Sequence, residues 1–181
     1  MDFEKCDIEG VYLISPKPVG DHRGVFHRHF CQKLYGDRGI DTTVMQTNVS
    51  VNAYAHTLRG FHYQLAPFQE GKTITVLKGA LYDIIVDLRP DSPTFKKWVS
   101  FQLTESNKYS IHVPKGCANA FMTLEDQTMV YYIASQAYHP EVERGFRYND
   151  PSFDFEWPCA PKHISDRDAN HPDFTVETHL Q

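Results

Sequence analysis

The sequence predicts an all-β protein, a jelly-roll barrel or sandwich with few short helices. Short apolar or alternating runs recur roughly every ten residues, separated by Gly, Pro, Asn and Asp, which is typical of antiparallel strands and turns. Aromatic residues make up 13% of the chain, including 12 Phe and 10 Tyr, and such side chains pack well on a pleated sheet. With 181 residues, 41% of them hydrophobic, the chain is long enough for one globular domain with a sizeable core.

Several segments along the chain carry the strand pattern. They are Val11–Ser15, Val25–Phe30, Thr43–Val51, Leu58–Gln64, Thr73–Lys78, Leu81–Leu88, Trp98–Leu103, Tyr109–Val113 and Thr128–Ser135. The clearest alternation lies in Leu81–Leu88, where Asp83 and Asp87 fall on one face and Tyr82 and Ile84 on the other.

Two regions lack the strand pattern. Gln32–Tyr35 and its neighbours are expected to be helical. From Pro151 onward the chain is rich in Pro, Asp and His, and we expect ordered loops and short helical turns that wrap the barrel, because Phe153 and Phe174 need an apolar surface to pack on. We therefore expect one jelly-roll domain over residues 1–181, with a C-terminal wrapping segment at about 151–181.

The net charge and the N-terminal sequence argue against a nucleic-acid-binding, membrane or secreted protein. The net charge is −5 at pH 7 without a Lys/Arg block, so no general nucleic-acid groove is expected. No apolar run approaches the roughly 20 residues that a membrane span requires. Met1–Gly10 is charged and does not resemble a signal peptide, so a cytoplasmic protein with no membrane partner is expected. The four cysteines form no CxxC pair and are expected to be free thiols.

A histidine in the fourth predicted strand is the first candidate for chemistry. Period two along Leu58–Gln64 places His62 on one face with Gly60 and Gln64, and Arg59 on the other face with Phe61 and Tyr63. A histidine beside a glycine on an inward face lines a cavity, because glycine leaves room next to it. The alternative is a core histidine whose polar atoms are satisfied by a neighbour.

Tyrosines and a carboxylate are the next candidates. Tyr131 and Tyr132 are adjacent in a predicted strand, so one of them faces the cavity, and Tyr138 could reach its mouth. The alternative is that these are barrel aromatics with their hydroxyls at the rim. Asp168, in the run Ser165–Asp168, could hydrogen-bond a histidine nitrogen and fix its tautomer, although the same run also fits a helix N-cap.

Motifs spread from about Gly10 to Pro172 occur together in one order. They are Asp21–Phe26, Gln46–Ser50, Leu58–Gln64, Asp87–Phe95, Pro114–Gly116, Tyr138–Glu141, Asn149–Pro151 and Ser165–Asp168. With them the chain resembles the dTDP-4-dehydrorhamnose 3,5-epimerases and related nucleotide-sugar epimerases. The resemblance implies a cupin-type jelly roll, a homodimer and an isomerase that inverts C3, C5 or both in a nucleoside-diphosphate 4-keto-6-deoxyhexose during deoxysugar biosynthesis.

The resemblance also implies roles for individual residues. His62 would be the base, Tyr132 the acid on the opposite sugar face and Asp168 the carboxylate that pairs with the histidine. The other implied substrate-binding positions are Arg23, Phe26, Gln46, Asn48, Arg59, Lys72, Tyr138, Glu143 and Arg167, the last standing where the family usually has Lys.

The implied reaction explains why these residue types are required. A C4 ketone acidifies the hydrogens on C3 and C5, since removal of either gives an enolate. Inversion needs a base on one face of the ring and an acid on the other. The enolate oxygen needs a positive or hydrogen-bonding neighbour, for which Lys72 is the candidate. The reaction requires no redox cofactor and no metal.

Two positions depart from the family pattern. Asn119 stands where the family has a substrate-contacting histidine, and an amide can hydrogen-bond the substrate but cannot carry a proton. Arg28 stands where the family has a glutamate that reads the base. Cytosine presents an acceptor at N3, which a donor such as Arg fits, so Arg28 predicts a CDP-linked substrate. The alternative is that Arg28 is a solvated surface change.

Three other interpretations remain open from the sequence. A metal-dependent cupin oxygenase would need an HxH pair and a further histidine, whereas this chain has His62-Tyr63-Gln64 and Asn119. A non-catalytic nucleotide-sugar-binding protein would not need the base, the acid and the aspartate together. A single-site epimerase acting at C3 or C5 of a dTDP-linked sugar would use the same residues.

Overall fold

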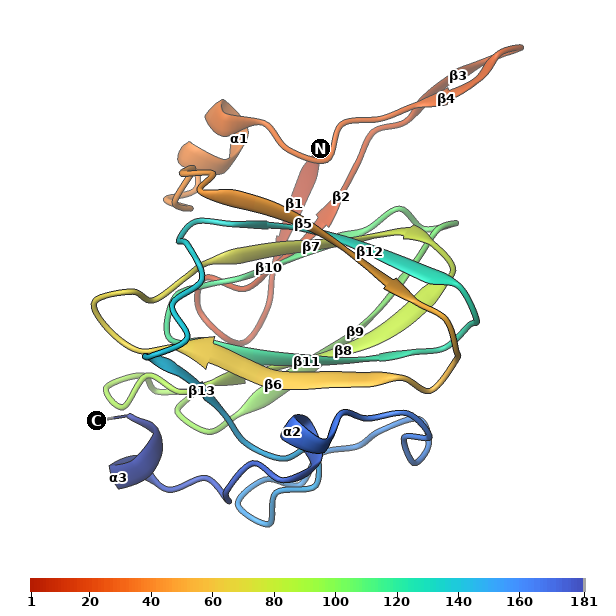
Figure 1. Cartoon of the computed structure of the whole chain (residues 1–181). Coiled ribbons are helices and arrows are strands. Elements are labelled where there is room, and N and C mark those ends of the chain that lie inside the picture. The colour runs from red at the N-terminus through yellow and green to blue at the C-terminus, as the bar shows by residue number, and fades with distance from the viewer. Residues whose placement is uncertain (181) are drawn as a thin grey trace.

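The computed structural model describes residues 1–180 and consists mainly of two antiparallel sheets that face each other (Figure 1). The six-stranded sheet contains, in spatial order, β1 (Asp2–Lys5), β2 (Tyr12–Ser15), β10 (Ser110–Val113), β7 (Lys72–Lys78), β12 (Thr128–Ala134) and β5 (Gln46–Asn52). The five-stranded sheet contains β13 (Glu143–Gly145), β6 (Leu58–Gln64), β11 (Cys117–Thr123), β8 (Ala80–Asp87) and β9 (Trp98–Thr104). The predicted all-β jelly roll is confirmed.

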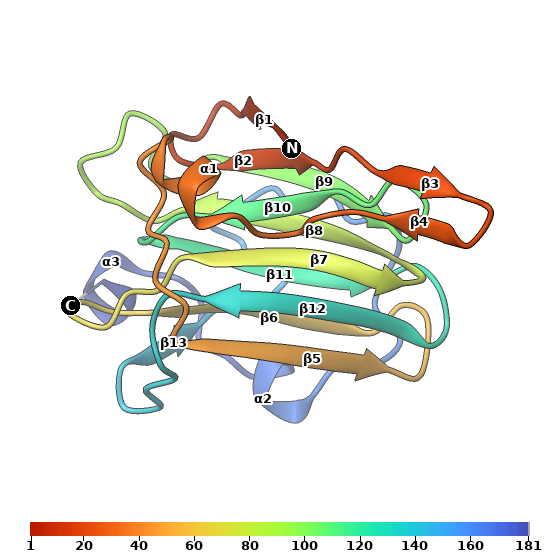
Figure 2. The same ribbon diagram turned by 90° about the horizontal axis from the view of Figure 1, so that it is seen from above.

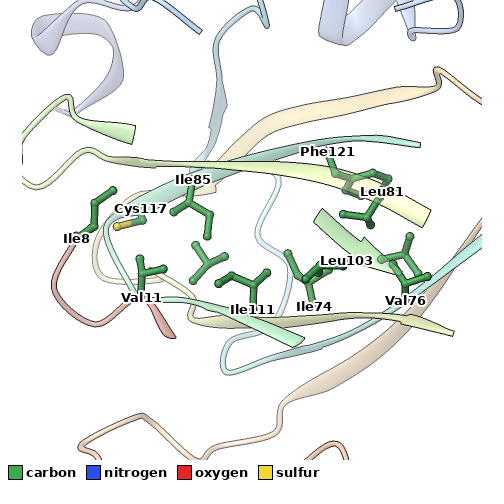
Figure 3. Close-up of a cluster of buried hydrophobic side chains, with 12 residues drawn as sticks. Ile8, Val11, Ile74, Val76, Leu81, Ile85, Leu103, Ile111, Cys117 and Phe121 are labelled. Atoms are coloured by element: carbon green, nitrogen blue, oxygen red, sulfur yellow. The ribbon is translucent and has the colours of Figure 1, made fainter. Parts of the chain in front are cut away.

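Between the two sheets lies an apolar core. Leu81 and Ile85 on β8 point toward Ile74 on β7 and Ile111 on β10, and all four side chains are buried (Figure 3). The alternation predicted for β8 explains this arrangement. Asp83 shares the inward face with Leu81 and Ile85, so the strand carries a carboxyl group into the interior of the sandwich.

The C-terminal residues cover the outer face of the five-stranded sheet (Figure 1). Phe61 on β6 stacks on Phe146 and on Phe155, with ring centroids 4.6 Å apart in each pair. Phe153 and Phe174 extend the same aromatic cluster. Two short helices lie in this segment, α2 (Asp166–Ala169) and α3 (Val176–His179). Both faces of the five-stranded sheet are therefore packed, whereas β5 of the six-stranded sheet leaves Val49 and Val51 exposed.

The N-terminal region adds two further features. Helix α1 (Gln32–Gly36) includes the predicted helical segment. The hairpin of β3 (Val19–Asp21) and β4 (Gly24–Phe26) extends away from both sheets, as Figures 1 and 2 show. Among residues 1–180 no helix is long and apolar enough to cross a membrane.

Several sequence-based strand assignments were incomplete, and the short strands β1, β3 and β13 were not predicted. Strand β11 was not predicted, because every one of its residues is buried and a strand packed on both faces shows no polar alternation. The predicted strand Val25–Phe30 ends at Phe26, and residues 27–30 form no strand.

A bulge in β6 changes the direction of its side chains. Asn119 of β11 pairs with His62 and Phe121 pairs with Arg59, so β6 contains one residue more than its partner over this interval. Gly60 lies inside the bulge with φ +113°, a conformation that favours glycine. A Cβ atom at this position would stand 2.6 Å from the carbonyl oxygen of Asn119. The bulge therefore depends on the absence of a side chain at residue 60.

The buried His112 predicts a pH-dependent stability. Burial lowers the pKa of His112 to about 4, and the charge of Asp41 offsets part of this effect. Between pH 6.5, the model-peptide pKa, and about 4, the unfolded chain binds a proton here that the folded chain does not. The free energy of unfolding should therefore fall by about 3 kcal/mol as the pH falls through this window. Urea denaturation at several pH values measures it, and His112→Asn should show a shallower decline; parallel curves would contradict the assignment.

The bulge predicts a second outcome. Gly60→Ala should lower the free energy of unfolding by about 1–3 kcal/mol, because the added methyl group forces β6 away from β11. Urea denaturation measures the loss. The matched control is Gly36→Ala, where the nearest atom would be 3.7 Å away and a change of no more than about 1 kcal/mol, toward higher stability, is expected. Equal stability of the two variants would show that the bulge tolerates a side chain.

Candidate active site

A cavity of about 240 Å³ opens between the two sheets. The five-stranded sheet contributes Arg59, His62, Asn119 and Phe121, and the six-stranded sheet contributes Ser50, Lys72, Ile74 and Tyr132. The predicted base and acid therefore line one cavity from opposite walls. A larger cavity of about 370 Å³ lies beside Lys5, Arg38 and Lys115, and no predicted site residue within 1–180 lines it.

His62 is held by a carboxylate from the C-terminal segment. Its Nε2 lies 2.8 Å from Oδ1 of Asp168, which is 106 residues away in the sequence. The other carboxylate oxygen, Oδ2, accepts a hydrogen bond from the backbone N–H of Gly60 at 3.3 Å. The Nε2–H tautomer of His62 donates to Asp168 and leaves the lone pair on Nδ1.

Both interpretations of the Ser165–Asp168 run apply. Ser165 is the N-cap of α2, since its Oγ accepts from the backbone N–H of Asp168 at 3.1 Å, and the Asp168 side chain still reaches His62. Burial would raise the pKa of Asp168, but the hydrogen bond and charge of His62 and the Gly60 N–H lower it below its ordinary value. Asp168 is therefore a carboxylate at neutral pH.

Tyr132 is the tyrosine of β12 that faces the cavity. It pairs in register with Asn48 on β5 and with Ile74 on β7, and adjacent Tyr131 points to the opposite face of the sheet. Tyr138 is 52% exposed, and its hydroxyl donates to Oε2 of Glu143 at 2.7 Å. The structure thus separates the two tyrosines, one on the wall of the cavity and one on the surface.

Lys72, the predicted partner of the enolate oxygen, lies among other polar residues in the interior of the sandwich. Lys72 forms an ion pair of 2.7 Å with Glu70, and both side chains are largely buried. Asn119 donates through Nδ2 to Oδ2 of Asp83 at 3.3 Å. Burial raises the pKa of Asp83 well above its ordinary value, although the Asn119 hydrogen bond and the charge of Lys72 act in the opposite direction. Burial therefore favours the protonated form of Asp83.

Arg59 lies on the same face as His62, which corrects the simple alternation predicted for Leu58–Gln64. The prediction placed these two side chains on opposite faces. The extra residue in the β6 bulge rotates the strand, so both line the cavity. Arg59 Nε donates to Oδ1 of Asn52 at 2.7 Å, which holds the guanidinium at the wall.

Three further predicted residues form a connected group with Tyr138. Glu143 accepts from Tyr138 and forms an ion pair with Arg167 of α2. The Gln46 side-chain oxygen accepts from the backbone N–H of Tyr138 at 3.0 Å. Through β13, Glu143 pairs with Gln64, two residues beyond His62 on β6. Asn48, on the same face of β5 as Ser50, has a buried Nδ2 that forms no hydrogen bond within residues 1–180.

The structure does not bring Arg23, Phe26 and Arg28 to the cavity of their own chain. Arg23 and Phe26 belong to the β3–β4 hairpin or its turn, Arg28 follows it, and all three are exposed. In the described part of the chain Arg23 is paired only with Asp21, at 2.5 Å.

Several residues around the site were missed by the sequence analysis. Ile74, Phe121, Glu70 and His171 were not singled out from the sequence, and Ser50 lies in the motif Gln46–Ser50 but was given no role. Asp83 could have been found, because it is a carboxyl group on the same strand face as Leu81 and Ile85. His171 lies beside the His62–Asp168 pair, and the ligand atoms of these three residues all lie within 4.8 Å of one another, close enough to hold a metal ion.

Comparison with known proteins supports the predicted family. The sequence profile of the dTDP-4-dehydrorhamnose 3,5-epimerase family matches residues 5–175. The chain is 38% identical to the dTDP-4-dehydrorhamnose 3,5-epimerase of Sinorhizobium fredii over 173 residues, which cover 95% of this chain and 89% of the relative. It is 37% identical to the Shigella flexneri enzyme of the same name, over 96% of each chain.

Solved structures agree with this assignment. The dTDP-4-dehydrorhamnose 3,5-epimerase of Bacillus anthracis with TDP and pyrophosphate bound superposes with a TM-score of 0.92 at 36% identity, covering 96% of this chain and 99% of the other. ChmJ of Streptomyces bikiniensis, a 3'-monoepimerase in complex with dTDP-quinovose, gives 0.89 at 32% identity, covering 97% of this chain and 90% of the other. The expectation of an isomerase is confirmed by these relatives. The chain belongs to the dTDP-4-dehydrorhamnose 3,5-epimerase family.

Proposed function

We propose that this protein epimerises a dTDP-linked 4-keto-6-deoxyhexose at C3 and C5 by removing and returning a proton through an enolate. The observation that carries the proposal is the cavity between the sheets, with His62 and its partner Asp168 on one wall and Tyr132 on the other. A sugar ring between these walls would present opposite faces to the imidazole and to the phenol.

The proposed chemistry follows from this arrangement. Neutral His62 removes the proton from the carbon next to the ketone, and the C–H electrons form the enolate with its charge on the C4 oxygen. The Asp168 carboxylate stabilises the imidazolium that results. The Tyr132 hydroxyl then donates its proton to the opposite face of the same carbon. His62 releases its proton to water and the phenolate takes one up, which restores the starting state.

In this reaction Lys72 is the residue that stabilises the negative charge on the enolate oxygen. Its ammonium group lies at the cavity and is positioned by Glu70 at 2.7 Å. A fixed cation in a site with little water stabilises developing negative charge more strongly than one in bulk solvent. Asn119, which donates to Asp83, adds a hydrogen-bonding amide that cannot carry a proton, so the acid–base roles fall to His62 and Tyr132.

The nucleotide is proposed to be dTDP. The relatives are named for dTDP-linked sugars, and two of the similar structures contain TDP or a dTDP-sugar. The CDP-linked substrate predicted from Arg28 has no support among these relatives. Arg28 is exposed and lies outside the cavity of its own chain.

A single-site epimerase is the second candidate. Asn119 removes one proton-carrying group from the site, and the Streptomyces relative is named a 3'-monoepimerase. The same base and acid would serve it, with inversion restricted to one carbon by the way the substrate is held.

We further propose that the protein is a homodimer in the cytoplasm. The β3–β4 hairpin exposes Val19, Val25 and Phe26 at 70%, 59% and 73%, a group of apolar side chains that a second copy would cover. That contact would bring Arg23 and Phe26 to the partner's substrate. The four cysteines, all within the described residues, are free thiols, which fits a reducing compartment.

The acid–base roles predict isotope exchange. With dTDP-4-keto-6-deoxyglucose in deuterated water, the protein should introduce deuterium at C3 and C5 with inversion, as followed by NMR. His62→Ala should slow exchange at every carbon by about 10²–10⁴-fold. Tyr132→Phe should retain proton removal and lose inversion, because the far-side donor is absent. Tyr131→Phe, whose side chain faces the other way, is the control. Normal inversion by Tyr132→Phe would make Tyr138 the next candidate, and deuterium at one carbon alone would favour the single-site enzyme.

The nucleotide assignment predicts a substrate preference. The kcat/KM for the dTDP-linked sugar should exceed that for the CDP-linked sugar by at least about tenfold, since a site that hydrogen-bonds one base leaves polar groups unpaired with another. Steady-state kinetics with both substrates measures the ratio. A preference for the CDP-linked sugar would restore the prediction made from Arg28.

The exposed hairpin predicts the oligomeric state. Sedimentation should give twice the chain mass of 20.9 kDa, and Val25→Asp should shift the protein toward the monomer because it places a charge in an apolar contact. Val176→Asp, at a position 40% exposed on α3, is the control and should remain a dimer. A wild-type monomer would contradict the proposal.

A further inference from the structure

His171 is a second imidazole beside the His62–Asp168 pair, and the proposed reaction does not use it. Its Nε2 lies 3.8 Å from Oδ1 of Asp168, the oxygen that contacts His62. The two histidine rings are 6.1 Å apart between centroids and nearly perpendicular, at 71°. One carboxylate oxygen therefore faces two imidazole Nε2 atoms.

The chain is built locally to place this ring. Asp168 and His171 are three residues apart across the end of α2, so their side chains leave the same side of the turn. Gly145, which pairs with His62 across β13 and β6, lies beneath the ring. A Cβ atom at residue 145 would stand 2.5 Å from Nε2 of His171, so a side chain there would displace the imidazole.

The Nε2 of His171 has a free coordinating position. It is buried and forms no hydrogen bond within the described chain. Arg167, the nearby cation on α2, is paired with Glu143. A neutral imidazole with an unpaired buried nitrogen is a ligand for a transition metal ion.

We propose that His62, Asp168 and His171 bind a divalent metal ion of the zinc class, through two imidazole nitrogens and one carboxylate oxygen. Zinc holds such atoms at about 2.0–2.2 Å, which places tetrahedral ligands roughly 3.3 Å from one another, and water can fill the fourth position. The separations from Oδ1 of Asp168 are 2.8 Å and 3.8 Å, so small side-chain rotations suffice. Magnesium, which prefers oxygen ligands, does not fit this set.

Metal binding and the proposed base function exclude each other; this consequence rests on the proposed function. A metal on Nε2 of His62 uses the lone pair of that nitrogen, and the neutral ring then carries its proton on Nδ1. Such a ring has no lone pair left to accept a proton from the sugar. The ion also takes the Asp168 oxygen that would stabilise the imidazolium. The metal is therefore an inhibitor of the reaction rather than a cofactor.

Titration calorimetry on the full-length, tag-free protein with zinc chloride tests the site without any substrate. Wild type should bind zinc with a site that His171→Leu weakens by at least about tenfold, since even the loss of groups that only support a ligand has that effect. His171→Asn is the second variant, in case the leucine prevents folding. His163→Leu, a histidine of the same C-terminal segment outside the cluster, should bind as wild type does.

Exchange assays then test the consequence. Zinc should abolish deuterium exchange by wild type, a chelator should restore it, and His171→Leu should keep its metal-free exchange while resisting zinc. Equal zinc affinity of wild type and both His171 variants, or loss of the zinc site in His163→Leu, would overturn the proposal. Absence of exchange by metal-free wild type would contradict the proposed function alone, because calorimetry reports the metal site separately.

Discussion

The hydrogen bond between Asp168 and His62 depends on how the C-terminal segment is held against the five-stranded sheet. The two residues are 106 positions apart, and no local structure connects them. Phe61, next to His62, stacks on Phe146 and Phe155, so one strand presents an imidazole to the cavity and an aromatic anchor to the opposite side. The aromatic packing of the C-terminal segment on the outer face of the sheet thus positions the Asp168 carboxylate to reach His62 at the cavity.

The asymmetry of the two sheets follows from the same packing. The five-stranded sheet is covered on both faces, which holds the backbone around His62 rigidly and accounts for the fully buried β11. The outer face of the six-stranded sheet is covered at β2, where Tyr35 of α1 packs on Tyr12 and Ile14, but β5 leaves Val49 and Val51 exposed. The sheet that is covered on both faces carries the proposed base, whereas the exposed side of the other sheet is available to a second copy of the chain.

Polar groups inside the sandwich are arranged in pairs. Lys72 is matched by Glu70 and Asn119 by Asp83, whereas the Arg59 guanidinium is held by the neutral side chain of Asn52 and has no ion-pair partner within residues 1–180. Burial favours the protonated form of Asp83, for which the uncharged amide of Asn119 is a suitable neighbour. His171 lies beside the same Asp168 carboxylate that pairs with His62. The carboxylate that would activate His62 as a base is therefore also one of the proposed metal ligands that would inhibit it.

The sequence by itself determined the all-β class, the approximate position of most strands and the family. Alternating polarity and turn residues are local signals, and motifs in a fixed order are visible without coordinates. It also indicated His62, Tyr132 and Asp168 as the residues of the site, and their roles remain a proposal. Strand β11 escaped notice because a strand buried on both faces has no alternation.

Only the tertiary structure decided which side chains meet. The β6 bulge moved Arg59 to the face of His62, and strict period-two reasoning cannot include an extra residue whose presence depends on the pairing with β11. Glu70, Asp83 and His171 acquire their importance from neighbours on other strands or in the C-terminal segment. The placement of Arg23 and Phe26 on a projecting hairpin, and of Arg28 just after it, likewise depends on long-range packing, which no local pattern of residues records.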